Sequence, residues 1–135
     1  MNAIESDESR RPLLIVTYRG LASTVEFEAF LSRVGDWLAR KERYFLVFDR
    51  SMADMPTAIQ RRRMAEWTTW RCAELGRFCG GAAFVITSPL IHGAFRAVLW
   101  LQQLPYPYVV VATQSEGVAW CRHQLDTTST PARPA

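Results

Sequence analysis

The sequence contains no hydrophobic run long enough to cross a membrane, no apolar leader segment and no closely spaced pair of cysteines. No apolar run approaches the ~20 residues that a membrane span needs, and Met1–Arg10 has no apolar centre, so we expect a soluble, cytoplasmic protein. The three cysteines, Cys72, Cys79 and Cys121, are an odd number and lack C-x-x-C spacing. This pattern predicts reduced thiols, with neither a metal site nor a cofactor.

Charge is too evenly balanced to indicate nucleic-acid binding. The chain has 16 basic and 13 acidic residues, and the run Arg61–Arg63 spreads over about 200° of a helix instead of forming one basic stripe. With 135 residues, 49% of them hydrophobic, one globular domain is expected. Residues 1–11 and 126–135 are polar or proline-rich and lack periodicity, so we predict flexible tails around one domain of residues 12–125.

Four short runs rich in Val, Ile and Phe alternate with stretches of helical periodicity. Parallel strands joined by helical crossovers produce this alternation, and the doubly apolar run YFLVF is typical of a strand covered on both faces. The predicted fold is therefore a single small α/β domain, with a mostly parallel four-stranded sheet and helices on both faces. The strand-like runs are Leu13–Thr17, Tyr44–Phe48, Ala82–Thr87 and Tyr108–Ala112.

Hydroxyl side chains mark where the predicted helices begin. A Ser or Thr that stands three residues before Glu or Gln can exchange hydrogen bonds with the free main-chain N–H groups of a first helical turn. We expect the second helix to run to about Phe78 and to be stopped by Gly80 and Gly81. The predicted caps of the four helices are Ser23, Thr57, Ser88 and Ser115.

The predicted third helix, roughly Pro89–Leu104, is apolar almost all the way round. Only His92, Arg96 and Gln103 form a narrow polar strip on its helical wheel. Packing against one face of a sheet cannot bury the rest, so we expect this helix to be either an interface or the wall of an apolar cavity. The expected interface residues are Phe95, Leu99 and Trp100, together with Trp70 on the polar side of the preceding helix.

Candidate ligand-binding residues lie where the strands end. Ligands of parallel sheets gather outside the carboxyl ends of the strands, where helix N-termini favour anions. An acid, a hydroxyl and an imidazole occur there, but their spacing matches no catalytic triad, and local hydrogen bonding accounts for the acid and the hydroxyl. We therefore expect no catalytic residue. The candidates for ligand binding are Asp49, Ser51, Thr87, Ser88 and His92.

The order of elements resembles the STAS-type domains, in particular the SpoIIAA-like bacterial group. Asp49 ends the second strand, and a Trp-containing helix, SEGVAWCRHQL, follows a Val-rich last strand. The resemblance covers about Leu13–Leu125 and implies a small domain that acts by binding: anti-sigma-factor antagonists dock a protein partner, and related folds carry lipids or other small ligands. The family commonly opens with two antiparallel strands, which adds a fifth strand to the expected sheet.

Signalling members of that family carry a phosphorylatable serine in a D-S-S-G-like turn. The corresponding turn of this chain reads DMPT over Asp54–Thr57, so the serine has no match. Thr57 and Ser51 are the remaining candidate regulatory hydroxyls, and Thr57 is already explained as a helix cap.

Two functions from different classes fit these observations, and an enzyme fits them less well. The first is a non-enzymatic regulatory or scaffolding module that binds a protein partner, or forms a homodimer, through the third helix. The alternative is a carrier of a small apolar ligand or lipid, in which the same helix walls a cavity near Ser51 and Thr87. A hydrolase or transferase that uses Asp49 and His92 is the third and least favoured interpretation.

Overall fold

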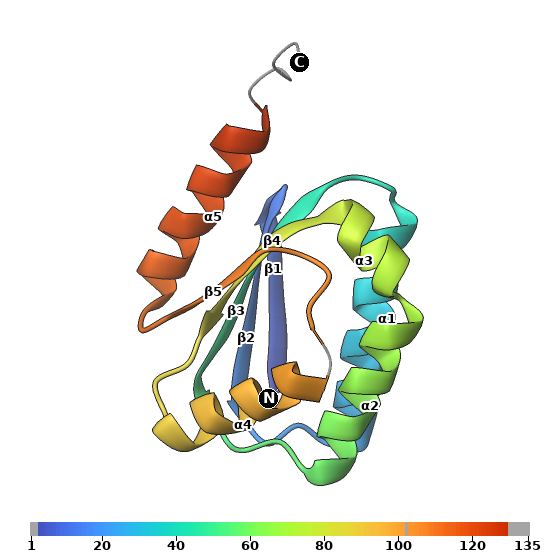
Figure 1. The fold of residues 1–135 in the computed structure, drawn as a ribbon, viewed down its shortest axis with the longest axis vertical. Helices are drawn as coiled ribbons and strands as arrows, with labels where there is room; N and C mark the ends of the chain where they lie inside the picture. Colours follow the sequence, from blue (N-terminus) through green and yellow to red (C-terminus); the bar gives the residue numbers. More distant parts are fainter. Residues whose placement is uncertain (1–2, 102, 130–135) are drawn as a thin grey trace.

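The chain folds around one five-stranded mixed sheet (Figure 1). The computed structural model describes residues 3–101 and 103–129. The strands follow the sheet in chain order; β1 is antiparallel to β2, and β2 to β5 run parallel to one another. The predicted, mostly parallel α/β sheet is confirmed, with β1 as its fifth strand. The strands are β1 (Ile4–Arg10), β2 (Leu13–Gly20), β3 (Tyr44–Ala53), β4 (Cys79–Val85) and β5 (Tyr108–Val111), and the helices are α1 (Thr24–Ala39), α2 (Ala58–Trp70), α3 (Cys72–Phe78), α4 (Pro89–Leu101) and α5 (Gln114–Ser129).

Helices α1 to α4 cover one face of the sheet, and α5 covers the other (Figure 1). Successive parallel strands that are added in one direction place their right-handed crossover helices on the same face. Because α5 follows the last strand, it is free of that constraint and packs on the opposite face. The strand side chains divide between the faces by alternation: Leu46 and Phe48 of β3 belong to the α1–α4 face, and Phe45 and Val47 belong to the α5 face.

The prediction of a flexible tail over residues 1–11 is wrong for Ile4–Arg10, which form β1. This strand pairs with β2 in antiparallel register, with Ile4 opposite Tyr18, so its main-chain groups gain partners. Its sequence, IESDESR, lacks an apolar alternation because β1 is an edge strand with no fully buried residue. A polar, charged edge strand protects a sheet against pairing with other chains.

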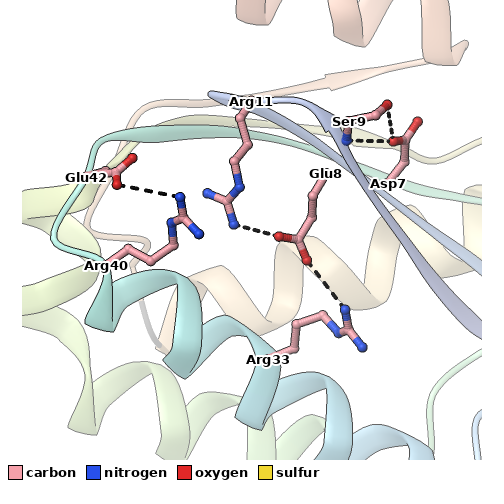
Figure 2. Close-up of polar contacts among 7 residues, drawn as sticks. All are labelled: Asp7, Glu8, Ser9, Arg11, Arg33, Arg40 and Glu42. Atoms are coloured by element: carbon pink, nitrogen blue, oxygen red, sulfur yellow. Dashed lines mark hydrogen bonds and ion pairs between the residues drawn. The ribbon is translucent and has the colours of Figure 1, made fainter.

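Charged side chains fasten β1 to α1 (Figure 2). The carboxylate of Glu8 accepts hydrogen bonds from Arg11, at 2.6 Å, and from Arg33 of α1, at 3.4 Å. At the start of the described chain, the main-chain N–H of Ala3 donates to the carboxylate of Glu26 at 2.6 Å. These contacts hold a strand that contributes little to the core.

The single long helix that was predicted to run to about Phe78 is interrupted. Arg71, with φ −99° and ψ 14°, separates α2 from α3. Gly80 and Gly81 do not stop a helix, because both lie inside β4. A Cβ atom at Gly80 would lie 2.5 Å from the ring of Phe45 on the neighbouring strand, so only glycine fits beside that ring. β4 therefore begins at Cys79, before the apolar run Ala82–Thr87 from which it was predicted.

The predicted caps of the first three crossover segments are confirmed. Ser23, Thr57 and Ser88 each accept a hydrogen bond from the main-chain N–H three residues on, at 3.1, 3.0 and 3.3 Å. In turn, the side-chain oxygen of Gln60 accepts a hydrogen bond from the main-chain N–H of Thr57, which completes a capping box. Local sequence thus sets where α1, α2 and α4 begin.

The last helix differs from its prediction at both ends. Thr113, rather than Ser115, is its cap, with Oγ1 3.2 Å from the N–H of Glu116. The helix continues to Ser129, so the predicted flexible tail is wrong for residues 126–129. Residues 130–135 of that predicted tail lie outside the described residues.

Candidate functional site

A partly open apolar cavity lies between the sheet and helices α1 to α4, and its volume is about 190 Å³. Alternate residues of the central strands form its floor, and one side of α4 forms part of its wall. The floor includes Tyr18, Phe48 and Phe84, and the α4 wall includes Ile91, Phe95 and Leu99. The sequence predicted that the third helix would be either an interface or the wall of an apolar cavity, and this cavity lies beside that helix.

Aromatic rings make the main contact between α4 and the sheet. The ring centroid of Phe95 lies 4.7 Å from that of Phe84, with a tilt of 46°, and 6.1 Å from that of Tyr108, nearly edge-on at 83°. Tilted and edge-on rings are favourable pairs. The cavity lies beside these rings, bounded by α4 on one side and by Met64 and Ala65 of α2 on another.

Two arginines interrupt this apolar lining near the carboxyl end of β3. Arg50 stands two residues after Phe48, so it faces the same side of the sheet, and its Nη2 donates to the main-chain carbonyl of Asp54 at 3.1 Å. Arg61 of α2 donates to the carbonyl of Pro56 at 2.6 Å. Within residues 3–101 and 103–129, neither guanidinium forms an ion pair with a carboxylate, and no Asp or Glu lines the cavity.

The hydroxyl of Tyr18 is buried beside Arg50. The guanidinium carbon lies 4.5 Å from the centroid of the Tyr18 ring. Tyr18 is only 4% exposed, and its hydroxyl has no hydrogen-bond partner in the described part of the chain. Burial raises the pKa of Tyr18 although the nearby Arg50 charge opposes the shift, so the hydroxyl stays protonated and can donate at neutral pH. Burial also lowers the pKa of Arg50, a group that nevertheless stays charged.

Burial makes two of the three cysteines, Cys79 and Cys121, unreactive. All three are free thiols, as predicted. Burial raises the pKa of Cys79 to about 12, and it has the same effect on Cys121. Both thiols are therefore protonated at neutral pH and are poor nucleophiles.

Residues 3–101 and 103–129 contain neither a candidate metal-binding group nor a candidate membrane-spanning helix. No cluster of three His, Cys, Asp or Glu side chains suited to a metal ion occurs in the described segments. None of the helices described here is both long and apolar enough to traverse a bilayer.

The residues predicted to bind a ligand take part in local hydrogen bonds and do not line this cavity. Asp49 is 8% exposed, and its carboxylate accepts from both the N–H and the hydroxyl of Ser51, at 2.9 and 2.7 Å. Thr87 donates to the main-chain carbonyl of Ser51 at 3.5 Å, and Ser88 caps α4. His92 is half-buried, and no hydrogen bond or ion pair among the described residues joins its side chain to Asp49.

The candidate regulatory hydroxyls are also engaged locally. Ser51 and Thr57 are both exposed. The first donates to Asp49, and the second caps α2. Phosphorylation at either position stays a prediction.

The predicted interface residues separate into two groups. Phe95 and Leu99 are half-buried in the cavity wall, whereas Trp100 is 88% exposed. Leu90, on the same helix, is 72% exposed. Trp70 of α2 is 73% exposed, with the guanidinium of Arg71 5.1 Å from its ring.

Sequence reasoning missed Tyr18 and Arg50. Their signal was the two-residue period of a strand: Tyr44, Leu46, Phe48 and Arg50 all line the cavity. The predicted strand-like run, Tyr44–Phe48, does not include Arg50. In the structure β3 continues to Ala53, which keeps Arg50 in register.

Comparison with known proteins supports the fold alone. No protein-family model matches the chain, and no curated protein matches it. An uncharacterised DUF3478-family protein with a SpoIIAA-like fold, from Shewanella loihica PV-4, is 15% identical over 88% of this chain and 92% of that one, with a TM-score of 0.64. The anti-sigma factor antagonist SpoIIAA in its unphosphorylated form is 13% identical over 89% and 98% of the two chains, with a TM-score of 0.65. An anti-sigma factor antagonist from Mycobacterium paratuberculosis is 15% identical over 88% and 92%, with a TM-score of 0.53. The chain therefore has a SpoIIAA-like fold, as the sequence resemblance implied.

Proposed function

We propose that this domain is a non-enzymatic binding module that takes up a small apolar ligand in the cavity beneath α4. The observation that carries the proposal is the cavity of about 190 Å³ with its mostly apolar lining. Protein interiors are packed so closely that voids larger than a water molecule are few. Apolar cavities of about 150 Å³ stay dry and bind benzene. A larger space of the same character favours an apolar occupant of at least that size.

The polar groups at the carboxyl ends of the strands support binding better than catalysis. An acid–base pair needs its two groups within reach of one reacting atom. The Asp49 carboxylate instead accepts hydrogen bonds from Ser51, and among the described residues neither a hydrogen bond nor an ion pair links it to His92. The hydrolase or transferase alternative therefore has no geometric support from these residues.

The ligand proposal can be tested with two matched substitutions of alanine. Ala94 of α4 lines the cavity, whereas Ala119 of α5 is exposed on the opposite face. We expect the neutral fluorescent probe N-phenyl-1-naphthylamine to bind the wild-type protein and Ala119→Leu equally, and Ala94→Leu at least fivefold more weakly, because the added side chain occupies the cavity. Native mass spectrometry of gently purified protein gives the mass of any natural ligand. A wild-type protein that does not bind the probe, or equal binding by both variants, contradicts the proposal.

A protein partner is the second candidate, and it is favoured by the outer side of α4. Leu90 and Trp100 are exposed there at 72% and 88%. Large apolar side chains in water favour association, and two of the solved structures with this fold are anti-sigma factor antagonists. If the partner is a second copy, light scattering will show a dimer that Trp100→Glu converts to a monomer and that Trp70→Glu leaves intact. A strict monomer at high concentration, unaffected by Trp100→Glu, argues against self-association.

A further inference from the structure

Resting on the proposed ligand function, we propose that the ligand is an amphiphile with a single anionic group, and that Arg50 binds this group while the hydroxyl of Tyr18 donates a hydrogen bond to it. The apolar part of such a ligand occupies the cavity between α4 and the sheet. The anionic group lies at the carboxyl end of β3, where both side chains line the cavity.

The first argument is the charge of the cavity lining. Arg50 is half-buried, and the part of an arginine that is removed from water costs free energy unless an anion compensates its charge. Among the described residues, Arg50 forms no ion pair: its guanidinium donates to the neutral main-chain carbonyl of Asp54 and lies near the rings of Tyr18 and Phe48, at 4.5 and 5.9 Å. Arg61 adds a second positive charge to the lining, and among the described residues no acidic side chain there offsets the two. The lining therefore complements an anion.

The second argument is the unsatisfied hydroxyl of Tyr18. A buried polar atom without a partner is rare in folded proteins, because it has lost its hydrogen bonds to water without gaining others. The Tyr18 hydroxyl donates to no acceptor within the described chain, although the residue is only 4% exposed. Since the hydroxyl is protonated at neutral pH, an anionic oxygen in the cavity would satisfy it. Arg50 and Tyr18 thus offer a charged and a neutral donor from adjacent strands.

A purely structural role for Arg50 makes a different prediction. Its bond to Asp54 and its stacking on Tyr18 could simply hold the end of β3 in place. In that case a loss of Arg50 would weaken the binding of charged and neutral ligands to the same extent. The proposal instead requires a loss that is selective for the charged ligand.

The experiment compares octanoate with 1-octanol, which share a chain and differ in charge. Both compete against N-phenyl-1-naphthylamine on the wild-type protein and on the variants Arg50→Gln, Arg50→Lys and Tyr18→Phe. Arg62→Gln is the matched control, since Arg62 is an exposed arginine of α2 outside the cavity lining. We expect Arg50→Gln to weaken octanoate binding at least tenfold with 1-octanol nearly unchanged, Arg50→Lys to retain part of the affinity, and Tyr18→Phe to weaken octanoate a few fold. Thermal unfolding of each variant establishes that it is folded.

The possible failures are distinguishable. In one outcome, 1-octanol binds and Ala94→Leu weakens its binding, but octanoate binds no better than 1-octanol and Arg50→Gln changes the affinity for neither ligand. The proposal of an anionic ligand is then wrong, and the proposed binding of an apolar ligand stands. Equal weakening of both ligands by Arg50→Gln also overturns the role of Arg50 in charge recognition. If neither ligand nor the probe binds the wild-type protein, both proposals fail.

Discussion

The two faces of the sheet are packed in opposite ways. On the α5 face the helix approaches closely: a Cβ atom at Gly117 would lie 3.2 Å from Val47 and 3.3 Å from Ala83, and Cys121 is 1% exposed. On the other face, large aromatic rings meet α4 and leave a cavity of about 190 Å³. Small residues such as Gly117 permit close contact between a helix and a sheet. The comparison shows that the α5 face is closely packed, whereas the α1–α4 face combines the larger cluster of buried residues with a cavity.

The strongest test of this comparison removes one phenylalanine from each face. Phe45 is 1% exposed on the α5 face, and Phe95 is half-buried beside the cavity. We expect Phe45→Ala to lower the free energy of unfolding by about 3–5 kcal/mol, because it creates a new void. Phe95→Ala removes less buried surface and should cost about 1–2 kcal/mol. Urea denaturation measures both, and equal losses would mean that the faces are packed alike.

Adding volume should give a contrast in the same direction. Gly117→Val forces new atoms against Val47 and Ala83, and we expect it to destabilise the protein by about 1–3 kcal/mol. Ala94→Leu places its new atoms in existing space, so its stability should stay within about 0.5 kcal/mol of wild type. Chemical denaturation of the two variants side by side is the measurement. A destabilised Ala94→Leu would indicate that the space beside α4 is not available to additional atoms.

The sequence predicted the parallel sheet and the apolar character of α4, but not the polar residues that line the cavity. The alternation of strand and helix gave the parallel sheet, and the excess of apolar residues in α4 indicated that this helix either walls a cavity or meets a partner. Both inferences depend on patterns that extend over many residues. The cavity-lining pair Tyr18 and Arg50 was missed, because the predicted second strand ended two residues before Arg50 and the end of a strand carries little local signal.

Contacts between residues distant in sequence account for the other differences between prediction and structure. β1 has no apolar alternation, since it is an edge strand held by pairing with β2 and by ion pairs, so composition alone made Ile4–Arg10 resemble a tail. Gly80 was interpreted as a helix stop because glycine is common there, yet the ring of Phe45 requires it inside β4. In both cases a contact distant in sequence decided the structure. A local sequence pattern does not indicate such contacts.

The smallest expected effect concerns the ion pairs of Glu8, which attach β1 to α1 (Figure 2). Partial burial on its own raises the pKa of Glu8, but the nearby indole of Trp37 and the contacts with Arg11 and Arg33 outweigh it and hold the pKa below its ordinary value of 4.5. The stabilisation is therefore fully present above about pH 4.5 and is lost as the pH falls through the lower pKa of the folded state. Glu8→Gln should cost about 0.5 kcal/mol at pH 7, and its unfolding curve should converge with that of the wild type in acid. Glu42→Gln, at the more exposed Arg40–Glu42 pair with its 3.6 Å separation, is the control and should change stability less. A Glu8→Gln deficit that persisted undiminished in acid would mean that packing, rather than charge, holds β1 to α1.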